Sequence, residues 1–119
     1  MSTAPVLDPS VLNTLRQLSV PGEPDVLTEV LKLFLDEVPP RLTRLRIAWA
    51  AGDIEQVHRL AHSLKGSAGN IGAQRMFEVC KELDGIGRSG EVQRAGPLVD
   101  ALNVEFADVD AEIRRLIGA

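Results

Sequence analysis

The residues with the clearest chemical potential lie in one segment, residues 53–72, which reads DIEQVHRLAHSLKGSAGNIG. Its apolar side chains recur every three or four positions and so predict the buried stripe of a helix: Ile54, Val57, Ala61, Leu64 and Ala68. His62 lies off this stripe, about 130° around the helix from its centre, and should face solvent. A neutral imidazole in that position is a competent nucleophile near neutral pH.

The residues that share a helix face with His62 are unusual for a surface helix. They are His58, Lys65, Gly66 and Gly69, one or two turns away along the same face. A glycine in mid-helix costs up to about 1 kcal/mol relative to alanine, so Gly66 should serve another purpose. Its missing side chain would let another protein approach the imidazole closely. Lys65 would place a positive charge one turn from the ring, suited to a phosphoryl group.

Other interpretations of these residues are less favoured. Any bundle carries solvated surface histidines, and His58 is predicted to be one of them. His58 and His62 have the spacing of a helical metal pair, but no third and fourth ligands stand out, so no metal is expected. Cys80 is the single cysteine and is predicted to be a small core residue without redox chemistry.

A glycine pattern at residues 85–90, GIGRSG, matches the G-x-G-x-x-G fingerprint of dinucleotide-binding proteins. That fingerprint needs a preceding strand and a βαβ unit, whereas a helical pattern precedes it here. We therefore interpret these glycines as a loop between helices. The chain also lacks a G-x-x-x-x-G-K-[ST] phosphate loop, so it is not expected to bind ATP or to act as a kinase itself.

The rest of the chain predicts an all-α protein. It has 119 residues, 45% of them hydrophobic and only 3% aromatic, and helical spacing occurs nearly everywhere. The expected helices cover residues 8–18, 25–38, 41–51, 53–69, 73–86 and 92–117. Pro39-Pro40 should stop or sharply kink the chain between the second and third of these, and the last should be irregular near Gly96-Pro97. Short links favour an up-down antiparallel four-helix bundle with additional short N-terminal helical segments, forming a single domain over residues 1–119 with an ordered core at about 8–117.

The segment from His62 to Gly72 resembles the H-x-L-K-G-x-x-x-x-[apolar]-G signature of histidine phosphotransfer (HPt) domains, and the resemblance extends over roughly residues 8–117. It implies a phosphorelay intermediate in which His62 accepts a phosphoryl group on Nε2. Lys65 would stabilise phosphoryl charge and Gly66 would give a receiver clearance. The resemblance places Asp84, where Gln is familiar, against the imidazole, with Arg88 one turn further on. Ser67 and Gly69 lie within the signature and are secondary candidates.

The same resemblance implies partners and a cellular setting. Response-regulator receiver domains and a hybrid sensor histidine kinase would be the partners, with Mg²⁺ held by the receiver and no cofactor in this chain. The chain would be a phosphocarrier and not an autonomous enzyme. The net charge of −4 disfavours a nucleic-acid partner, and we expect no membrane partner, a monomer and a cytoplasmic location.

Two alternatives to a relay remain. The chain could be a helical adaptor that docks signalling partners without phosphotransfer, but an adaptor has no need of a nucleophile. A small metal- or nucleotide-dependent enzyme is the other, and the missing ligands and phosphate loop count against it.

Overall fold

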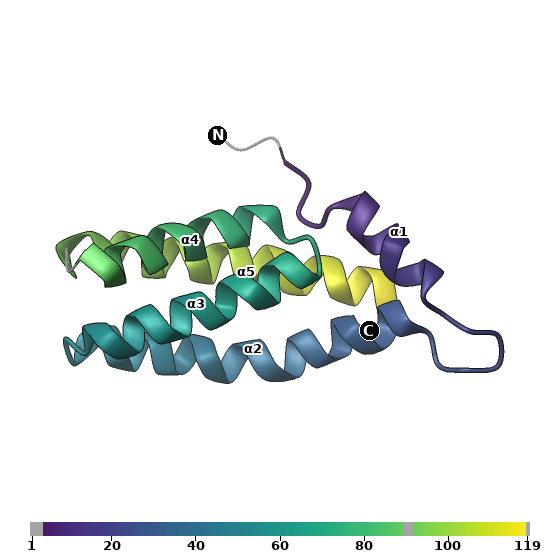
Figure 1. The fold of residues 1–119 in the computed structure, drawn as a ribbon, viewed down its shortest axis with the longest axis horizontal. Helices are drawn as coiled ribbons and strands as arrows, with labels where there is room; N and C mark the ends of the chain where they lie inside the picture. The colour runs from purple at the N-terminus through teal and green to yellow at the C-terminus, as the bar shows by residue number, and fades with distance from the viewer. Residues whose placement is uncertain (1–3, 90–91, 119) are drawn as a thin grey trace.

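In the part of the chain that the structure describes, four long helices form the body of the molecule, and Figure 1 shows how they lie side by side. The computed structural model describes residues 4–89 and 92–118, without the side chains of residues 87–89 and 92. The elements are α1 (Pro9–Gln17), α2 (Val26–Ala50), α3 (Ile54–Asn70), α4 (Gln74–Ser89), the 3₁₀ turn η1 (Val92–Arg94) and α5 (Ala95–Ile117). All regular elements in the described ranges are helices, which confirms the predicted all-α class.

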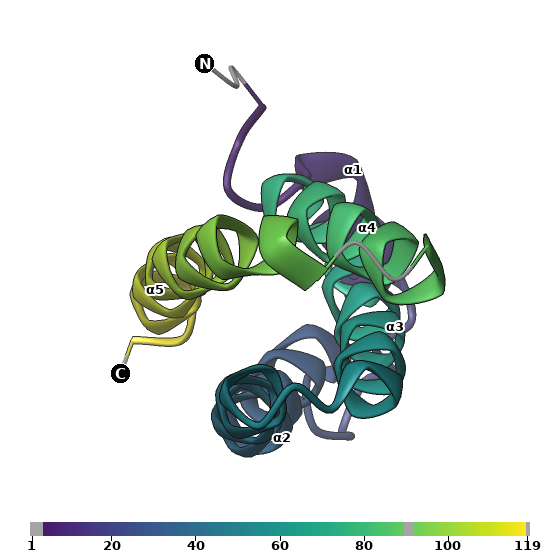
Figure 2. The same cartoon turned by 90° about the vertical axis from the view of Figure 1, so that its left-hand side faces the viewer.

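The long helices close into a ring. Helix α2 packs on α3, α3 on α4, α4 on α5, and α5 on α2. Figure 2, which looks along the bundle, shows this arrangement around a shared interior. Short turns at residues 51–53 and 71–73 join α2 to α3 and α3 to α4, so consecutive helices run antiparallel. The result is the expected up-down bundle, with α1 as the additional N-terminal segment.

Two helices begin at aspartates whose side chains cap the first turn. The Asp8 side chain accepts a hydrogen bond from the Ser10 N–H, and Pro9 occupies the first turn of α1. The Asp53 side chain accepts from the Gln56 N–H and begins α3. Both helices therefore begin where the sequence predicts.

Helix α2 corrects the prediction at Pro39-Pro40. The two prolines lie inside one continuous helix, so the separate helices expected over 25–38 and 41–51 do not exist. The prolines cannot donate to the carbonyls of Leu35 and Asp36, and this weakens the helix. A single buried stripe nevertheless runs through them, made of Leu27, Leu31, Phe34, Val38, Leu42, Leu45 and Ala48. Burial of that stripe against the bundle outweighs two lost backbone hydrogen bonds.

The glycine-rich segment also differs from its prediction. Helix α4 continues through Gly85 and Gly87 to Ser89, so these residues are not the loop that the sequence indicates. Gly90 lies outside the described residues. The helix expected over 92–117, irregular near Gly96-Pro97, is a 3₁₀ turn at Val92–Arg94 followed by α5, and Gly96-Pro97 lie within the first turn of α5.

The turn after α3 carries a glycine that the fold requires. Gly72 has φ +73°, and a Cβ there would lie 2.9 Å from the Cβ atoms of Asp8 and Val11. Its carbonyl accepts a hydrogen bond of 2.8 Å from the Asp8 N–H. Gly72 therefore serves the left-handed turn and the close approach of α1, and both set where α3 ends.

Candidate functional site

Helix α3 presents His62 to solvent as the spacing predicts. Val57, Ala61, Leu64 and Ala68 are buried on its inner face. The His62 side chain is 68% exposed on the opposite side. Burial of these four residues fixes the rotation of α3 about its axis, and in that orientation the His62 imidazole points to solvent.

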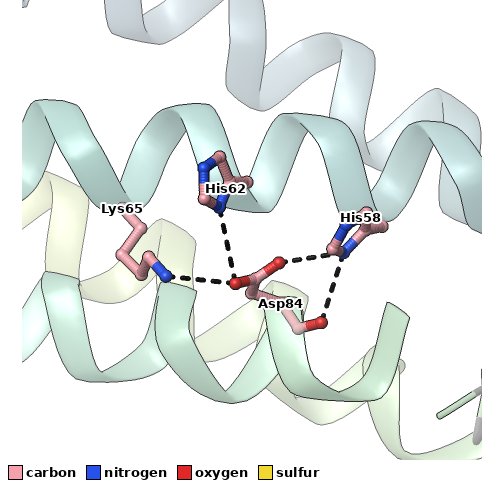
Figure 3. Close-up of polar contacts among 4 residues, drawn as sticks. All are labelled: His58, His62, Lys65 and Asp84. Atoms are coloured by element: carbon pink, nitrogen blue, oxygen red, sulfur yellow. Dashed lines mark hydrogen bonds and ion pairs between the residues drawn. The ribbon is translucent and has the colours of Figure 1, made fainter. Parts of the chain in front are cut away.

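Helix α4 supplies a buried carboxylate beside the imidazole. Asp84 is 2% exposed at its side chain, and its Oδ2 lies 3.6 Å from His62 Nδ1. Figure 3 shows the second ring nitrogen of His62 pointing away from Asp84. This separation is longer than a hydrogen bond, but the negative charge of the carboxylate beside Nδ1 favours a proton on that nitrogen and a lone pair on Nε2. The nucleophilic atom is therefore the exposed one.

Two further groups from α3 contact the same carboxylate (Figure 3). Lys65 Nζ donates to Asp84 Oδ2 at 3.1 Å. His58 Nδ1 lies 2.9 Å from Asp84 Oδ1 and 3.4 Å from the Asp84 carbonyl oxygen. We call His58, His62, Lys65 and Asp84 the Asp84 cluster. Its members come from two turns of α3 and one position of α4.

The cluster revises the sequence interpretation of His58 and adds a contact for Lys65. His58 is half-buried and bound to Asp84, so the prediction of a plain surface histidine is wrong. Its signal in the sequence is the four-residue spacing from His62, which places both rings above the same position of α4. Lys65 is not a freely solvated charge, because its ammonium group already contacts Asp84.

Gly66 and Gly69, which lie on the same face of α3 as His62, differ in their surroundings. A Cβ added at Gly66 would meet nothing within 4 Å, so the helix surface beside His62 is open there. A Cβ at Gly69 would make ordinary contacts with the Phe77 ring at 3.5 and 3.6 Å. Gly66 is thus dispensable for packing, and its absent side chain leaves room for an approaching molecule.

The remaining candidates are Ser67 and Arg88. Ser67 faces α2, where its hydroxyl receives a hydrogen bond of 3.4 Å from Arg41 Nη1. Ser67 also donates to the Ser63 carbonyl within α3. The Arg88 side chain lies outside the described part of the chain, so nothing places it against His62.

Metal and redox chemistry receive no support from the described side chains. Among them, no group of three or more His, Cys, Asp and Glu is arranged to hold a metal ion. Cys80 is buried, and its burial raises the pKa of the thiol from an ordinary 9.0 to about 12. The thiol is therefore protonated at neutral pH.

Comparisons with known proteins identify the family of this chain. The family model described as Hpt domain matches residues 29–116, which include the whole Asp84 cluster. The chain belongs to the Hpt domain family. Within the Hpt domain, residues 4–89 and 92–118 contain no helix long and apolar enough to span a membrane.

Individual relatives carry the same description. The Hpt domain is 36% identical over 69 residues to histidine-containing phosphotransfer protein 5 of Arabidopsis thaliana, and 33% identical to protein 2 of that plant. Each match covers 56% of this chain and 44% of the plant protein, so the chain spans less than half the length of these relatives. The crystal structure of histidine-containing phosphotransfer protein B from Pseudomonas aeruginosa PAO1 superposes with a TM-score of 0.89 at 34% identity. That superposition covers 98% of this chain and 97% of the other.

Proposed function

We propose that this Hpt domain relays a phosphoryl group between receiver-domain aspartates through phosphohistidine at His62. The observation that carries the proposal is the exposed His62 imidazole, whose Nδ1 faces the Asp84 carboxylate and whose Nε2 is directed to solvent. Hpt family proteins are phosphotransfer intermediates, and the matched region contains this histidine. An adaptor that only docks its partners would have no need of an exposed nucleophile.

In the proposed step, the Nε2 lone pair of His62 attacks the phosphorus of an aspartyl phosphate. The N–P bond forms as the P–O bond to the receiver breaks, and the aspartate leaves as a carboxylate. The ring keeps its proton on Nδ1, next to Asp84, so the positive charge that develops on the imidazole lies beside a negative one. Donation to a second receiver is the reverse of these events.

Lys65 and Gly66, which lie on the same face of α3, also have a part in this step. Lys65 places its ammonium group one turn from the imidazole, where it can shift from Asp84 toward phosphoryl oxygens. Gly66 leaves the surface open for the receiver. The Mg²⁺ ion belongs to the receiver in this proposal, as do the other groups that act on the aspartyl phosphate.

The partners are receiver domains of response regulators, with a hybrid sensor histidine kinase as the source of phosphoryl groups. The chain acts as a monomeric carrier with no kinase activity of its own. The cytoplasmic location expected from the sequence stays a prediction.

The test is a two-step transfer. One receiver, phosphorylated with acetyl phosphate and freed of the donor, is mixed with the Hpt domain, and intact-mass measurement follows the added phosphoryl group. A second receiver is then added. The relay predicts the gain of one acid-labile, alkali-stable phosphoryl group on the Hpt domain and its passage to the second receiver. Receiver binding without any mass gain would support the adaptor instead.

A further inference from the structure

An open cavity lies between α2 and α3, outside the Asp84 cluster. Its volume is about 280 Å³, and its apolar lining comes from the end of α2 and from α3: Ile47, Ala48, Ala51 and Leu60. Ile47 is 64% exposed, although isoleucine is among the residues most often buried in proteins. We call this hollow the Ile47 cavity. An apolar hollow with an exposed isoleucine is suited to receive an apolar side chain of another molecule.

The charged residues that line the cavity are Arg44 and Asp53. The Asp53 carboxylate is already engaged, since it accepts a hydrogen bond of 3.2 Å from the Gln56 N–H at the start of α3. Arg44 is exposed and makes no hydrogen bond or ion pair with the described residues. Its guanidinium is therefore open to a partner, and a carboxylate is the group that it pairs with best.

The Ile47 cavity lies within reach of a protein that is seated over His62. Figure 2 shows α3 between α2 and α4, so the outer face of α3 has the Asp84 cluster along one edge and the cavity along the other. A helix with its side chains is about 10–12 Å wide, which sets the spacing of these two edges. A standard interface covers about 800 Å² of each partner, equal to a disc of about 16 Å radius. A receiver that covers such an area around His62 therefore reaches the cavity.

We propose that the Ile47 cavity is a docking point for the receiver domain, which inserts an apolar side chain there and pairs an adjacent Asp or Glu with Arg44. The proposal rests on the proposed relay, and it names a part of this chain that selects the receiver. The receiver is the partner of choice because the proposed transfer already requires it to cover the outer face of α3.

The cavity is separated from the reacting atoms by the width of α3, so it should affect binding and not the chemical step. Contacts that are equally strong in the bound complex and in the transition state change the half-saturating receiver concentration and leave the limiting rate constant. This split distinguishes a docking residue from Lys65, whose removal is expected to slow the transfer itself.

The test measures receiver binding and phosphoryl transfer separately. The first receiver of the two-step transfer is titrated, unphosphorylated, against the Hpt domain by calorimetry. Rapid-quench transfer is then followed over a range of phosphorylated receiver concentrations. The variants are Ile47→Ser and Arg44→Glu. Their controls are Val104→Ser, at a 62% exposed position of α5, and Arg46→Glu, at an exposed position about 200° around α2 from Arg44.

We expect Ile47→Ser and Arg44→Glu each to weaken receiver binding by about tenfold or more, with limiting transfer rates equal to that of the wild type. Val104→Ser and Arg46→Glu should bind as the wild type does. Phosphoramidate, a small donor that needs no receiver, should phosphorylate all four variants at the wild-type rate. Receiver binding at wild-type strength by both cavity variants would overturn the proposal.

Sedimentation of the wild type and of Ile47→Ser tests a second copy of this chain as the occupant. Both should be monomers, and a wild-type dimer that Ile47→Ser dissociates would overturn the proposal. The proposed function fails separately. A receiver that binds the wild type without transferring a phosphoryl group would remove the relay, while the binding of the cavity variants would still decide the docking point. Absence of any receiver binding to the wild type would overturn both.

Discussion

Lys65 Nζ lies 3.1 Å from Asp84 Oδ2, so the ammonium group nearest to the imidazole is already paired with a buried carboxylate before any phosphoryl group arrives. The pair holds Lys65 at the edge of the site, with 24% of its side chain exposed. A phosphoryl group on His62 would therefore compete with Asp84 for this cation. In the proposed relay, Lys65 would therefore assist the reaction without being an obligatory participant.

We expect Lys65→Ala to slow phosphoryl transfer from a receiver by about ten- to a hundredfold without abolishing it. A charge-assisted hydrogen bond contributes about 1.5–3 kcal/mol, which corresponds to that range of rates. Rapid-quench transfer assays measure the change. Lys32→Ala, which removes an exposed lysine on α2, should transfer at the wild-type rate. A Lys65→Ala rate equal to that of Lys32→Ala would show that this cation takes no part in the step.

Gly66→Gln should fold normally and yet be strongly impaired in transfer from a receiver. No atom lies within 4 Å of the position of its Cβ, so the new side chain points into open space. It would stand one turn from His62 on the receiver's path, where displacement by about 1 Å can cost on the order of a hundredfold in rate. The thermal midpoint should equal or exceed that of the wild type, because glycine is the weaker helix former.

The control for Gly66→Gln is Ala107→Gln, which adds the same side chain at an exposed position of α5. That variant should transfer normally. Phosphorylation of Gly66→Gln by phosphoramidate should be less affected, because a small donor needs less room. Normal transfer from the receiver to Gly66→Gln would mean that Gly66 is not present for clearance.

The sequence predicted α3 and the position of His62 well because a long amphipathic helix is specified locally. The stripe through Val57 and Leu64 determines the buried face, and the opposite face follows from helix geometry. Asp53 and Gly72 mark the two ends through a side-chain cap and a left-handed turn. The amphipathic stripe, the cap and the turn depend on nearby residues and can be recognised without the fold, although Gly72 also allows the close approach of α1.

The errors arose where tertiary contacts override local preference. Pro39-Pro40 would end an isolated helix, but the buried stripe of α2 continues across them. Gly85 and Gly87 favour a loop, yet α4 extends through both. The four-residue spacing of His58 from His62 places both on one face of the helix, but it does not show the contact with Asp84, because that contact joins residues 26 positions apart. Pairing between helices is not encoded in the periodicity of either one.

Leu64→Ala should destabilise the fold by about 2–5 kcal/mol, because Leu64 is fully buried and truncation leaves a cavity between α3 and its neighbours. Urea unfolding monitored by circular dichroism measures this free energy. Ser63→Ala, at the exposed neighbouring position, should change it by no more than about 0.5 kcal/mol. Equal effects of the two substitutions would place the inner face of α3 elsewhere.

Cys80 should be unreactive in the folded protein. Burial raises the pKa of its thiol to about 12 from 9.0, so the thiolate is scarce at pH 8. Because the pKa of the Cys80 thiol is higher in the folded protein than in the unfolded chain, this group contributes to the free energy of unfolding below pH 9.0. The contribution is lost as the pH rises above 9.0 and the thiol of the unfolded chain ionises. An aromatic disulfide reagent should label the thiol only after unfolding. Fast labelling at pH 8 under native conditions would contradict its place in the core.

The most direct test of the account is the identity of the phosphorylated residue. Wild type, His62→Gln and His58→Gln are each incubated with a phosphorylated receiver, and intact mass with peptide fragmentation locates the phosphoryl group. The account predicts one phosphoryl group on His62 in the wild type and in His58→Gln, and none in His62→Gln, whose thermal midpoint should be nearly unchanged because the side chain is 68% exposed. A phosphoryl group on folded His62→Gln, carried by His58 or any other residue, would contradict it.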